Sequence, residues 1–361
     1  MAIEQIDIEN FLKLSEECSV LDVRSPGEFL HAHIPGAFSL PLFTDEQREI
    51  IGTAYKQQSR QVAVKKGLEF FSERIIIMLT EAERIIKNNS LKFSNANRVL
   101  LHCWRGGMRS RSVAWLLDLY GFKVFTLKGG YKAFRNWALT QFETEYELNI
   151  LGGYTGSGKT EVLQEIKKNG EMVIDLESLA HHKGSAFGSL GEKPQPGQEM
   201  FENMLAVELF KKAPSRDFPS IDDNREKPNS IRKIWVEDES RHIGTVGIPK
   251  TFWNNMRKSR LYFLEIPFEE RLNRIVSTYG KFEKKELVTS IMKIQKRLGG
   301  LETKNAINYL LENKVKECFS ILLRYYDKMY AAALLNRENI EEVLNKIACE
   351  TVDVRNAGKL N

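Results

Sequence analysis

The chain has 361 residues, which is too long for one ordinary domain and enough for about two or three. Hydrophobic residues make up 42% and charged residues 28%, a balance typical of a globular protein and unlike that of a disordered one. Lys and Arg number 53 against 48 Asp and Glu, giving a net charge of +5. This mild excess permits contact with a polyanion but does not require one.

No apolar run reaches the roughly 18 residues of a membrane span, and acidic residues interrupt the N-terminal pattern. We therefore expect no membrane partner and no signal peptide. The four cysteines are far apart and form no Cys-x-x-Cys pair: Cys18, Cys103, Cys318 and Cys349. This spacing argues against a disulfide framework and a structural zinc site, and it favours a cytoplasmic protein with a single reactive thiol.

The first predicted domain, residues 1–140, alternates strands and helices. Short buried strands are predicted at 19–23, 38–40, 98–102 and 123–127. Helical spacing covers about 44–95, and a shorter helix is predicted at 112–120. This order predicts a parallel α/β sheet with ligands at the carboxyl ends of its strands.

A second α/β domain is predicted over 141–267. Its strands are expected at 148–151, 172–175, 234–237 and 261–265, with helices near 159–168, 198–212 and 249–259. The third region, 268–361, reads as nearly all helix. Within it, an aromatic stripe at helical spacing is expected to face the core: Tyr325, Tyr326, Met329 and Tyr330.

A candidate nucleophile, Cys103, lies where a predicted strand meets a helix. Free backbone N–H groups and the helix dipole favour an anion there, so the thiol should ionise readily and act as a nucleophile. Gly106 and Gly107 allow the loop to curl, and Arg105 and Arg109 add positive charge. We therefore predict that Cys103, Arg105 and Arg109 form a catalytic group.

A second candidate site, residues 153–160, reads Gly-Tyr-Thr-Gly-Ser-Gly-Lys-Thr and matches G-x-x-x-x-G-K-[ST] between a strand and a helix. In such a loop the backbone N–H groups form an anion nest, the lysine neutralises a phosphate and the threonine can hold Mg²⁺. The predicted binding residues are Gly153, Gly156, Ser157, Gly158, Lys159 and Thr160.

A metal ion in such a loop usually gains a second contact from an acid at the end of another strand. Two sets of acids are candidates: Asp175 with Glu177, or Glu237 with Asp238 and Glu239. We favour Glu237 and Asp238 as ligands beside Thr160, because the strand before them reads as the better buried one.

Residues 22–29 and 31–37 resemble the N-terminal signature of rhodanese (sulfurtransferase) domains, and Gly129-Gly130 with Trp137 resembles their closing segment. The loop at 102–110 also fits H-C-x-x-G-x-x-R-[ST], the loop of cysteine-dependent phosphatases. It is one residue longer than common rhodanese loops. The extra length suggests a cradle wide enough for a tetrahedral, phosphate-like oxyanion.

The two loops, followed by Val-Glu-Asp-Glu-Ser-Arg-His-Ile-Gly at 236–244, together closely resemble the tRNA 2-selenouridine synthase family. The resemblance runs from about Asp22 to Gly247. It implies a rhodanese-like parallel-sheet domain followed by a P-loop NTPase-like α/β domain with a helical C-terminal extension. It also implies a transferase that acts on the wobble 2-thiouridine of the lysine, glutamate and glutamine tRNAs.

In that family, a geranyl group moves from geranyl diphosphate to the sulfur, and selenium from selenophosphate then replaces geranylthiol. The resemblance thus implies that Lys159, Thr160 and Mg²⁺ stabilise a diphosphate leaving group. It also suggests that Cys103 takes selenium as a Cys–Se adduct while Arg105 and Arg109 hold the phosphate. We expect tRNA and a supply of selenophosphate as partners of a monomer.

The sequence is compatible with three other functions. One is an ATP-dependent sulfurtransferase with a rhodanese domain and a P-loop. The second is a cysteine-dependent phosphatase, which the length of the loop at 102–110 supports. The third is a nucleotide-dependent tRNA-binding switch in which Cys103 is only structural.

Overall fold

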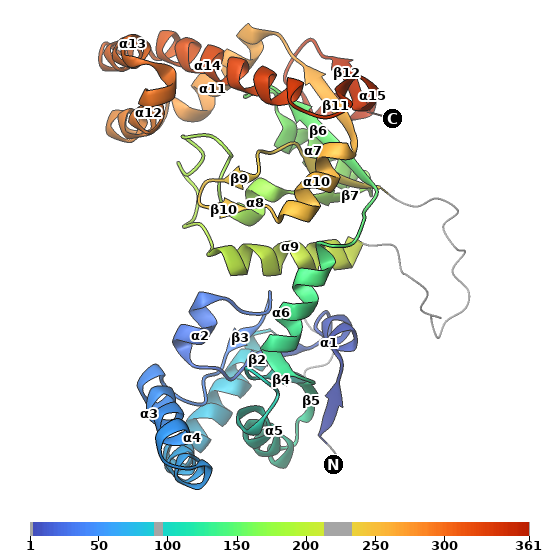
Figure 1. The fold of residues 1–361 in the computed structure, drawn as a ribbon, viewed down its shortest axis with the longest axis vertical. Helices are drawn as coiled ribbons and strands as arrows, with labels where there is room; N and C mark the ends of the chain where they lie inside the picture. The colour runs from blue at the N-terminus through green and yellow to red at the C-terminus, as the bar shows by residue number, and fades with distance from the viewer. Residues whose placement is uncertain (1–2, 90–96, 213–232, 361) are drawn as a thin grey trace, which may run out of the picture. The chain divides into compact units, whose positions relative to one another are not determined.

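The computed structural model describes residues 3–89, 97–212 and 233–360. The chain divides into two compact units, which Figure 1 shows in blue to green and in green to red. The first unit comprises Met1–Gln141 together with Glu202–Val207, and the second comprises Phe142–Phe201 together with Glu208–Asn361. Each unit is an α/β structure with its own parallel sheet, as the sequence predicted.

The first unit is built on a five-stranded sheet in the order β1-β5-β4-β2-β3. All four pairings are parallel. The strands are β1 (Glu4–Ile6), β2 (Ser19–Asp22), β3 (Phe38–Ser39), β4 (Arg98–His102) and β5 (Lys123–Leu127). Strand β4 is the central one, and its last four residues are buried.

The helices of the first unit are α1 (Ile8–Leu14), α2 (Pro26–His31), α3 (Asp45–Gln57), α4 (Arg60–Asn88), α5 (Met108–Tyr120) and α6 (Gly130–Gln141). The region expected to be helical over about 44–95 contains two helices, because Ser59 adopts an extended backbone and caps α4 by accepting the Val62 N–H at 3.2 Å. Residues 90–96 of that prediction lie outside the described part.

The second unit has a five-stranded sheet in the order β12-β11-β6-β8-β7, again parallel throughout. Its strands are β6 (Leu148–Gly153), β7 (Met172–Ile174), β8 (Ile234–Glu237), β11 (Arg260–Glu265) and β12 (Leu344–Ala348). Strands β9 (His242–Ile243) and β10 (Val246–Gly247) form a separate antiparallel pair.

Strand β12 corrects the expectation that residues 268–361 are nearly all helix. It pairs with β11 from Leu261–Leu344 to Glu265–Ala348. As an edge strand it is only half buried and contains Asn345 and Lys346, so it lacks the apolar pattern of a central strand.

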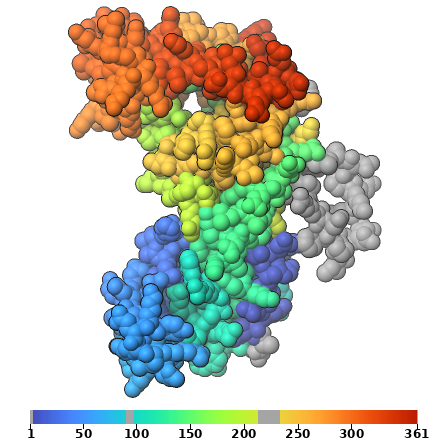
Figure 2. All heavy atoms as spheres, viewed as in Figure 1, coloured from blue at the N-terminus to red at the C-terminus, as the bar shows by residue number. Residues whose placement is uncertain are grey.

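The helices of the second unit lie around this sheet. They are α7 (Lys159–Lys168), α8 (Leu176–Ala180), α10 (Lys250–Lys258), α11 (Phe268–Tyr279), α12 (Lys284–Leu298), α13 (Gly300–Leu311), α14 (Val315–Leu335), α15 (Ile340–Val343) and a 3₁₀ helix at Val354–Lys359. Helix α9 (Gln198–Lys212) is divided between the units, because its Glu202–Val207 segment belongs to the first. Helices α11 to α14 share one apolar core, and α12, α13 and α14 pack closely in the space-filling view of Figure 2. Within the described residues, no helix is both long and apolar enough to cross a membrane.

A buried ion pair links several elements of the first unit. Arg24 and Asp22 are 1% and 0% exposed, and the Arg24 Nη2 lies 2.5 Å from the Asp22 Oδ2. The same Nη2 donates to the Ala32 carbonyl at 2.8 Å, and the guanidinium lies 3.8 Å above the Tyr131 ring. One side chain therefore joins the end of β2 to the end of α2 and to α6.

Replacing Arg24 by Met should destabilise the first unit by about 3–5 kcal/mol, because it leaves the Asp22 carboxylate buried without its cation. Hydrogen exchange of peptides from β2 and β4 reports this loss directly. The control Arg60→Met removes an exposed guanidinium at the start of α4 and should change stability by about 0.5 kcal/mol at most. Equal protection in Arg24→Met and the control would contradict the prediction.

Candidate active sites

The phosphate-binding loop joins the carboxyl end of β6 to α7, the context that the motif requires. Gly153, Gly156 and Gly158 have φ values of 154°, 83° and 77°. A Cβ on Gly153 would lie 2.5 Å from the Ser157 Oγ, and one on Gly156 would lie 3.0 Å from the Arg271 carbonyl oxygen. The loop therefore needs glycine at these positions, and α7 begins with no side-chain cap on its N–H groups.

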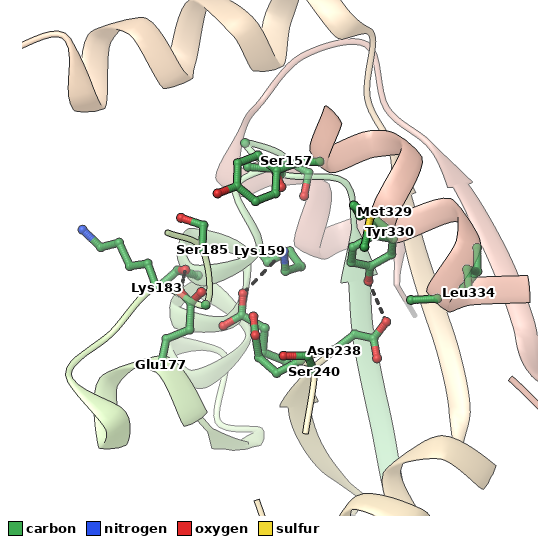
Figure 3. A pocket seen from close by; sticks show the side chains of 18 of the residues that line it. Ser157, Lys159, Glu177, Lys183, Ser185, Asp238, Ser240, Met329, Tyr330 and Leu334 are labelled. Atoms are coloured by element: carbon green, nitrogen blue, oxygen red, sulfur yellow. Dashed lines mark hydrogen bonds and ion pairs between the residues drawn. The ribbon is translucent and has the colours of Figure 1, made fainter. Parts of the chain in front are cut away.

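Lys159, the first residue of α7, reaches back over the loop (Figure 3). Its Nζ donates to the Gly153 carbonyl at 3.3 Å and lies 3.7 Å from the Glu237 Oε1. Burial lowers the pKa of Lys159, but Glu237, Glu239 and Glu177 outweigh it and raise the pKa overall. The ammonium group is therefore charged at neutral pH and available to an anion.

Three carboxylates face the loop. Each of Glu177, Glu237 and Glu239 offers an oxygen atom, and these atoms lie within 4.8 Å of one another. The Thr160 Oγ1 is 3.5 Å from the Glu177 Oε2, whereas Asp175 instead caps the N-terminus of α8. The sequence alone favoured Glu237 among these acids and left Glu177 and Glu239 aside.

The three carboxylates are buried close together, which disfavours their charged forms. Burial, followed by repulsion from a neighbouring carboxylate, raises the pKa of Glu177 to about 8 and that of Glu239 to about 8. The same causes raise the pKa of Glu237 well above its usual range. Glu237 is 1% exposed, and its Oε2 has no hydrogen-bond partner. A divalent cation would satisfy this oxygen and relieve the repulsion, so the residues fit a hard metal ion.

Asp238, which the sequence favoured as a metal ligand, is held elsewhere. Its carboxylate accepts hydrogen bonds from the Tyr330 hydroxyl at 2.6 Å and from the Arg337 Nη2 at 2.9 Å. Successive side chains of an extended chain point to opposite sides, so Glu237 and Glu239 share one side while Asp238 takes the other. That alternation, applied to the end of β8, is the signal that identifies Glu239 from the sequence.

A cavity of about 1010 Å³ opens beside the loop. The phosphate loop and the three carboxylates line one part of it, and Met329 and Leu334 face it in Figure 3. The aromatic stripe that we expected in the core lines this cavity. Of its residues, Tyr326 also packs against the apolar core of α11 to α14, whereas Met329 is 44% exposed. Helix α14 buries a different face, the one with Cys318, Phe319, Leu322 and Leu323. The stripe therefore lies on a face that can line the cavity. We call the following residues the apolar wall: Trp253, Tyr325, Tyr326, Met329, Tyr330 and Leu334.

The first unit places Cys103 directly after β4, at the base of the loop that leads into α5. The thiol is 3% exposed, and its Sγ lies 3.3 Å from the Ser110 Oγ. Burial raises the pKa of the thiol, but the Ser110 hydroxyl and the Arg109 guanidinium outweigh it, so the pKa is lowered overall. The lowered pKa has the direction that the sequence led us to expect for a thiol that ionises readily.

The loop around Cys103 is closed on one side and open on the other. A Cβ on Gly106, whose φ is 64°, would lie 2.8 Å from the Leu127 carbonyl oxygen. A Cβ on Gly130 would lie 2.3 Å from the Cys103 carbonyl oxygen. A Cβ on Gly107 would meet no atom within 4 Å. Solutes therefore have room at the Gly107 side, next to the N-terminus of α5.

The two arginines of this loop differ in their surroundings. The Arg109 Nη1 donates to the Glu28 Oε2 at 2.7 Å, which fixes the side chain against α2. Arg105 is exposed, and its guanidinium has no hydrogen-bond or ion-pair partner among the described residues. Sequence reasoning did not assign Glu28 a role, although it lies within the rhodanese-like segment at 22–29.

The pKa of Cys103 can be tested through Ser110. In Ser110→Ala the thiolate loses its hydroxyl donor, so the midpoint of the pH dependence of Cys103 alkylation should rise by about one unit, equivalent to about 1.4 kcal/mol. Iodoacetamide labelling across pH, read by mass spectrometry of the Cys103 peptide, measures this midpoint. The control Ser112→Ala, also on α5, should leave it unchanged. An unshifted midpoint in Ser110→Ala would mean that this hydrogen bond does not stabilise the thiolate.

Comparisons with known proteins agree with both halves of this architecture. The family model of the tRNA 2-selenouridine synthase AAA domain matches residues 146–353, and that of the rhodanese-like domain matches residues 7–136. The chain is 34% identical to the tRNA 2-selenouridine synthase of Bdellovibrio bacteriovorus, over 93% of this chain and 94% of that protein.

Two further relatives carry the same name. Identity to the Pseudomonas syringae pv. syringae protein is 33%, over 86% of this chain and 87% of that one. Identity to the Nitrosomonas europaea protein is 36% over 72% of this chain, and the match spans 63% of that protein's length. The chain belongs to the tRNA 2-selenouridine synthase family.

Proposed function

We propose that this chain is a cytoplasmic transferase that converts the wobble 2-thiouridine of the lysine, glutamate and glutamine tRNAs to 2-selenouridine. In the first step a geranyl group passes from geranyl diphosphate to the sulfur of the base. In the second step selenium from selenophosphate replaces geranylthiol. The names of the relatives support the overall conversion, and the two anion-binding loops support two separate steps.

The observation that carries the geranyl step is the combination of a phosphate loop and an apolar wall in one cavity. A prenyl diphosphate has a doubly charged end and a hydrocarbon chain, which match these two surfaces. The diphosphate would bind the loop N–H groups and Lys159, while the chain would lie against Met329 and Leu334. Burying the chain there removes apolar area from water and adds binding energy.

The same residues fit the chemistry of allylic transfer. As the bond between carbon and oxygen breaks, negative charge develops on the diphosphate and positive charge on the allylic carbon. Lys159 and the N–H groups at the start of α7 stabilise the diphosphate. The tyrosine rings of the apolar wall present π faces that favour the allylic cation.

Mg²⁺ is the proposed cofactor of this step. Thr160, Glu177, Glu237 and Glu239 are the residues that would hold it. When bound, Mg²⁺ neutralises charge on a diphosphate leaving group. The unpartnered Glu237 Oε2 and the raised pKa values of the three carboxylates support a cation here, in place of the Asp238 contact that we expected.

The first unit is proposed to act on selenophosphate. Cys103 is a buried cysteine with a lowered pKa at the base of a loop with an open Gly107 side, and Arg105 and Arg109 add positive charge. Such a cradle suits a tetrahedral oxyanion with several negative charges. The thiolate and the phosphate loop belong to different units, which is consistent with two reactions rather than one.

In Lys159→Ala, geranylation should fall by about 10²- to 10³-fold, because the leaving diphosphate loses its cation. Selenation of tRNA that is already geranylated should continue at the wild-type rate. Mass spectrometry of tRNA nucleosides separates the two products. The control Lys167→Ala removes an exposed lysine from the same helix and should retain both activities. Loss of both activities in Lys159→Ala would argue against separate sites.

In Met329→Asn, the KM for geranyl diphosphate should rise about tenfold, since roughly 1.4 kcal/mol of apolar contact with the chain is lost. Inhibition by inorganic diphosphate, which has no chain, should stay unchanged. Leu335→Asn is the matched control, because Leu335 lies on the same helix but does not line the cavity. Equal effects on the substrate and on inorganic diphosphate would place the chain elsewhere.

A further inference from the structure

The redox state of selenium restricts what Cys103 can do in the proposed selenation. Selenium must reach the base as a selenide nucleophile in order to displace geranylthiolate from the ring carbon. In selenophosphate the selenium already has this state, and phosphorus is phosphorus(V). If the thiolate attacked selenium, the Cys–Se product would be oxidised and phosphorus would leave as phosphorus(III). That route then needs a reductant to recover selenide.

We propose that the Cys103 thiolate attacks phosphorus instead, so that selenophosphate is cleaved as a phosphate ester is in a cysteine phosphatase. This inference rests on the proposed function. The S–P bond forms and the P–Se bond breaks, and selenium leaves with the bonding electron pair as selenide. Selenide attacks the geranylated base and expels geranylthiolate. Water then cleaves the S–P bond, giving phosphate, the free thiolate and a proton released to solvent.

The spacing of the loop supports attack at phosphorus. Five residues separate Cys103 from Arg109, and the loop ends at the N-terminus of α5. Residue Gly107, the N-cap of α5, provides no side-chain cap, so the first N–H groups of the helix stay available to phosphoryl oxygens. The open side of the loop is also at Gly107. The proposed attack requires the tetrahedral group to reach the sulfur from this side of the loop, next to the uncapped N–H groups of α5.

Ser110 has the position needed for both halves of the reaction. In the thiol form the Cys103 S–H donates to the Ser110 Oγ at 3.3 Å, and the Ser110 hydroxyl donates to the Gly107 carbonyl at 3.1 Å. Once the thiol ionises, the hydroxyl can turn and donate to the thiolate across the same 3.3 Å. The thiolate is the nucleophile when the S–P bond forms and the leaving group when water cleaves it. The same hydrogen bond therefore assists both steps, and its loss should slow release of the phosphoryl group.

Arg109 is oriented for a phosphoryl group through Glu28. The Glu28 Oε2 accepts from a single nitrogen, Nη1, at 2.7 Å. An arginine side chain carries five N–H donors, so donors remain for phosphoryl oxygens. Arg105, which is exposed and unpartnered among the described residues, adds a second positive charge. Both cations stabilise the negative charge on the phosphoryl oxygens as the S–P bond forms and the P–Se bond breaks.

The test uses the full chain with selenophosphate and no tRNA, quenched in acid and digested for mass spectrometry. The Cys103 peptide should carry a phosphoryl group, and one equivalent of selenide should be released and trapped with a bimane reagent. The mass spectrum distinguishes a selenium adduct from phosphocysteine, because selenium has several stable isotopes and gives a broad isotope pattern, whereas phosphorus has only one. Ser110→Ala should accumulate more phosphocysteine, about tenfold, while Ser112→Ala should resemble the wild type.

A selenium isotope pattern on Cys103 would overturn the inference, and so would normal selenation of geranylated tRNA by Cys103→Ala. Absence of any adduct in both the wild type and Ser110→Ala, together with active selenation, would also overturn it. If phosphocysteine forms but geranylated tRNA is never selenated, the proposed function fails while the attack at phosphorus stands. The two ideas are therefore separable.

Discussion

Both candidate sites depend on one structural constraint, an anion-binding loop between the carboxyl end of a central parallel strand and the N-terminus of a helix. In the first unit the strand is β4 and the helix is α5, and in the second unit they are β6 and α7. The strand fixes the base of each loop inside a buried sheet, and the helix supplies unpaired N–H groups. Glycines at Gly106 and Gly156 let the chain turn where a Cβ would collide with neighbouring atoms.

The two loops differ in the charge placed beside them, and this difference decides their chemistry. Cys103 lies near Ser110 and Arg109, which favour a thiolate in spite of burial. Lys159 lies among three carboxylates, whose pKa values are raised by burial and mutual repulsion. The first arrangement stabilises the ionised Cys103 side chain as a nucleophile. The second leaves an excess of carboxylates, which a bound metal cation would neutralise. Similar backbone geometry is thus compatible with the two roles proposed above, a covalent site in one unit and a leaving-group site in the other.

The sequence predicts the loops well because each is a contiguous motif, at 103–110 and at 153–160, whose geometry is local. It predicts the carboxylates less well because they come from separate segments. Asp238 instead accepts hydrogen bonds from Tyr330 and Arg337, which lie about a hundred residues further along the chain. No local sequence pattern predicts contacts at that separation. For the same reason, helical spacing on α14 identified a stripe but could not tell whether it faces a core or a cavity. Edge strand β12 was missed because half-exposed strands carry a weak apolar pattern.

Keeping the thiolate and the phosphate loop in different units follows from their reactivity. An allylic cation alkylates any good nucleophile near it, and a thiolate is a better nucleophile than the sulfur of a thiouracil ring. If the cavity beside the phosphate loop binds a prenyl diphosphate, as we propose, a cysteine like Cys103 placed in it would be alkylated by the substrate. The carboxylates Glu177, Glu237 and Glu239 would also raise the pKa of such a thiol through like-charge repulsion. Under the proposed function, placing the two groups in different units preserves the Cys103 thiol for selenophosphate and leaves the thiolated base as the prenyl acceptor.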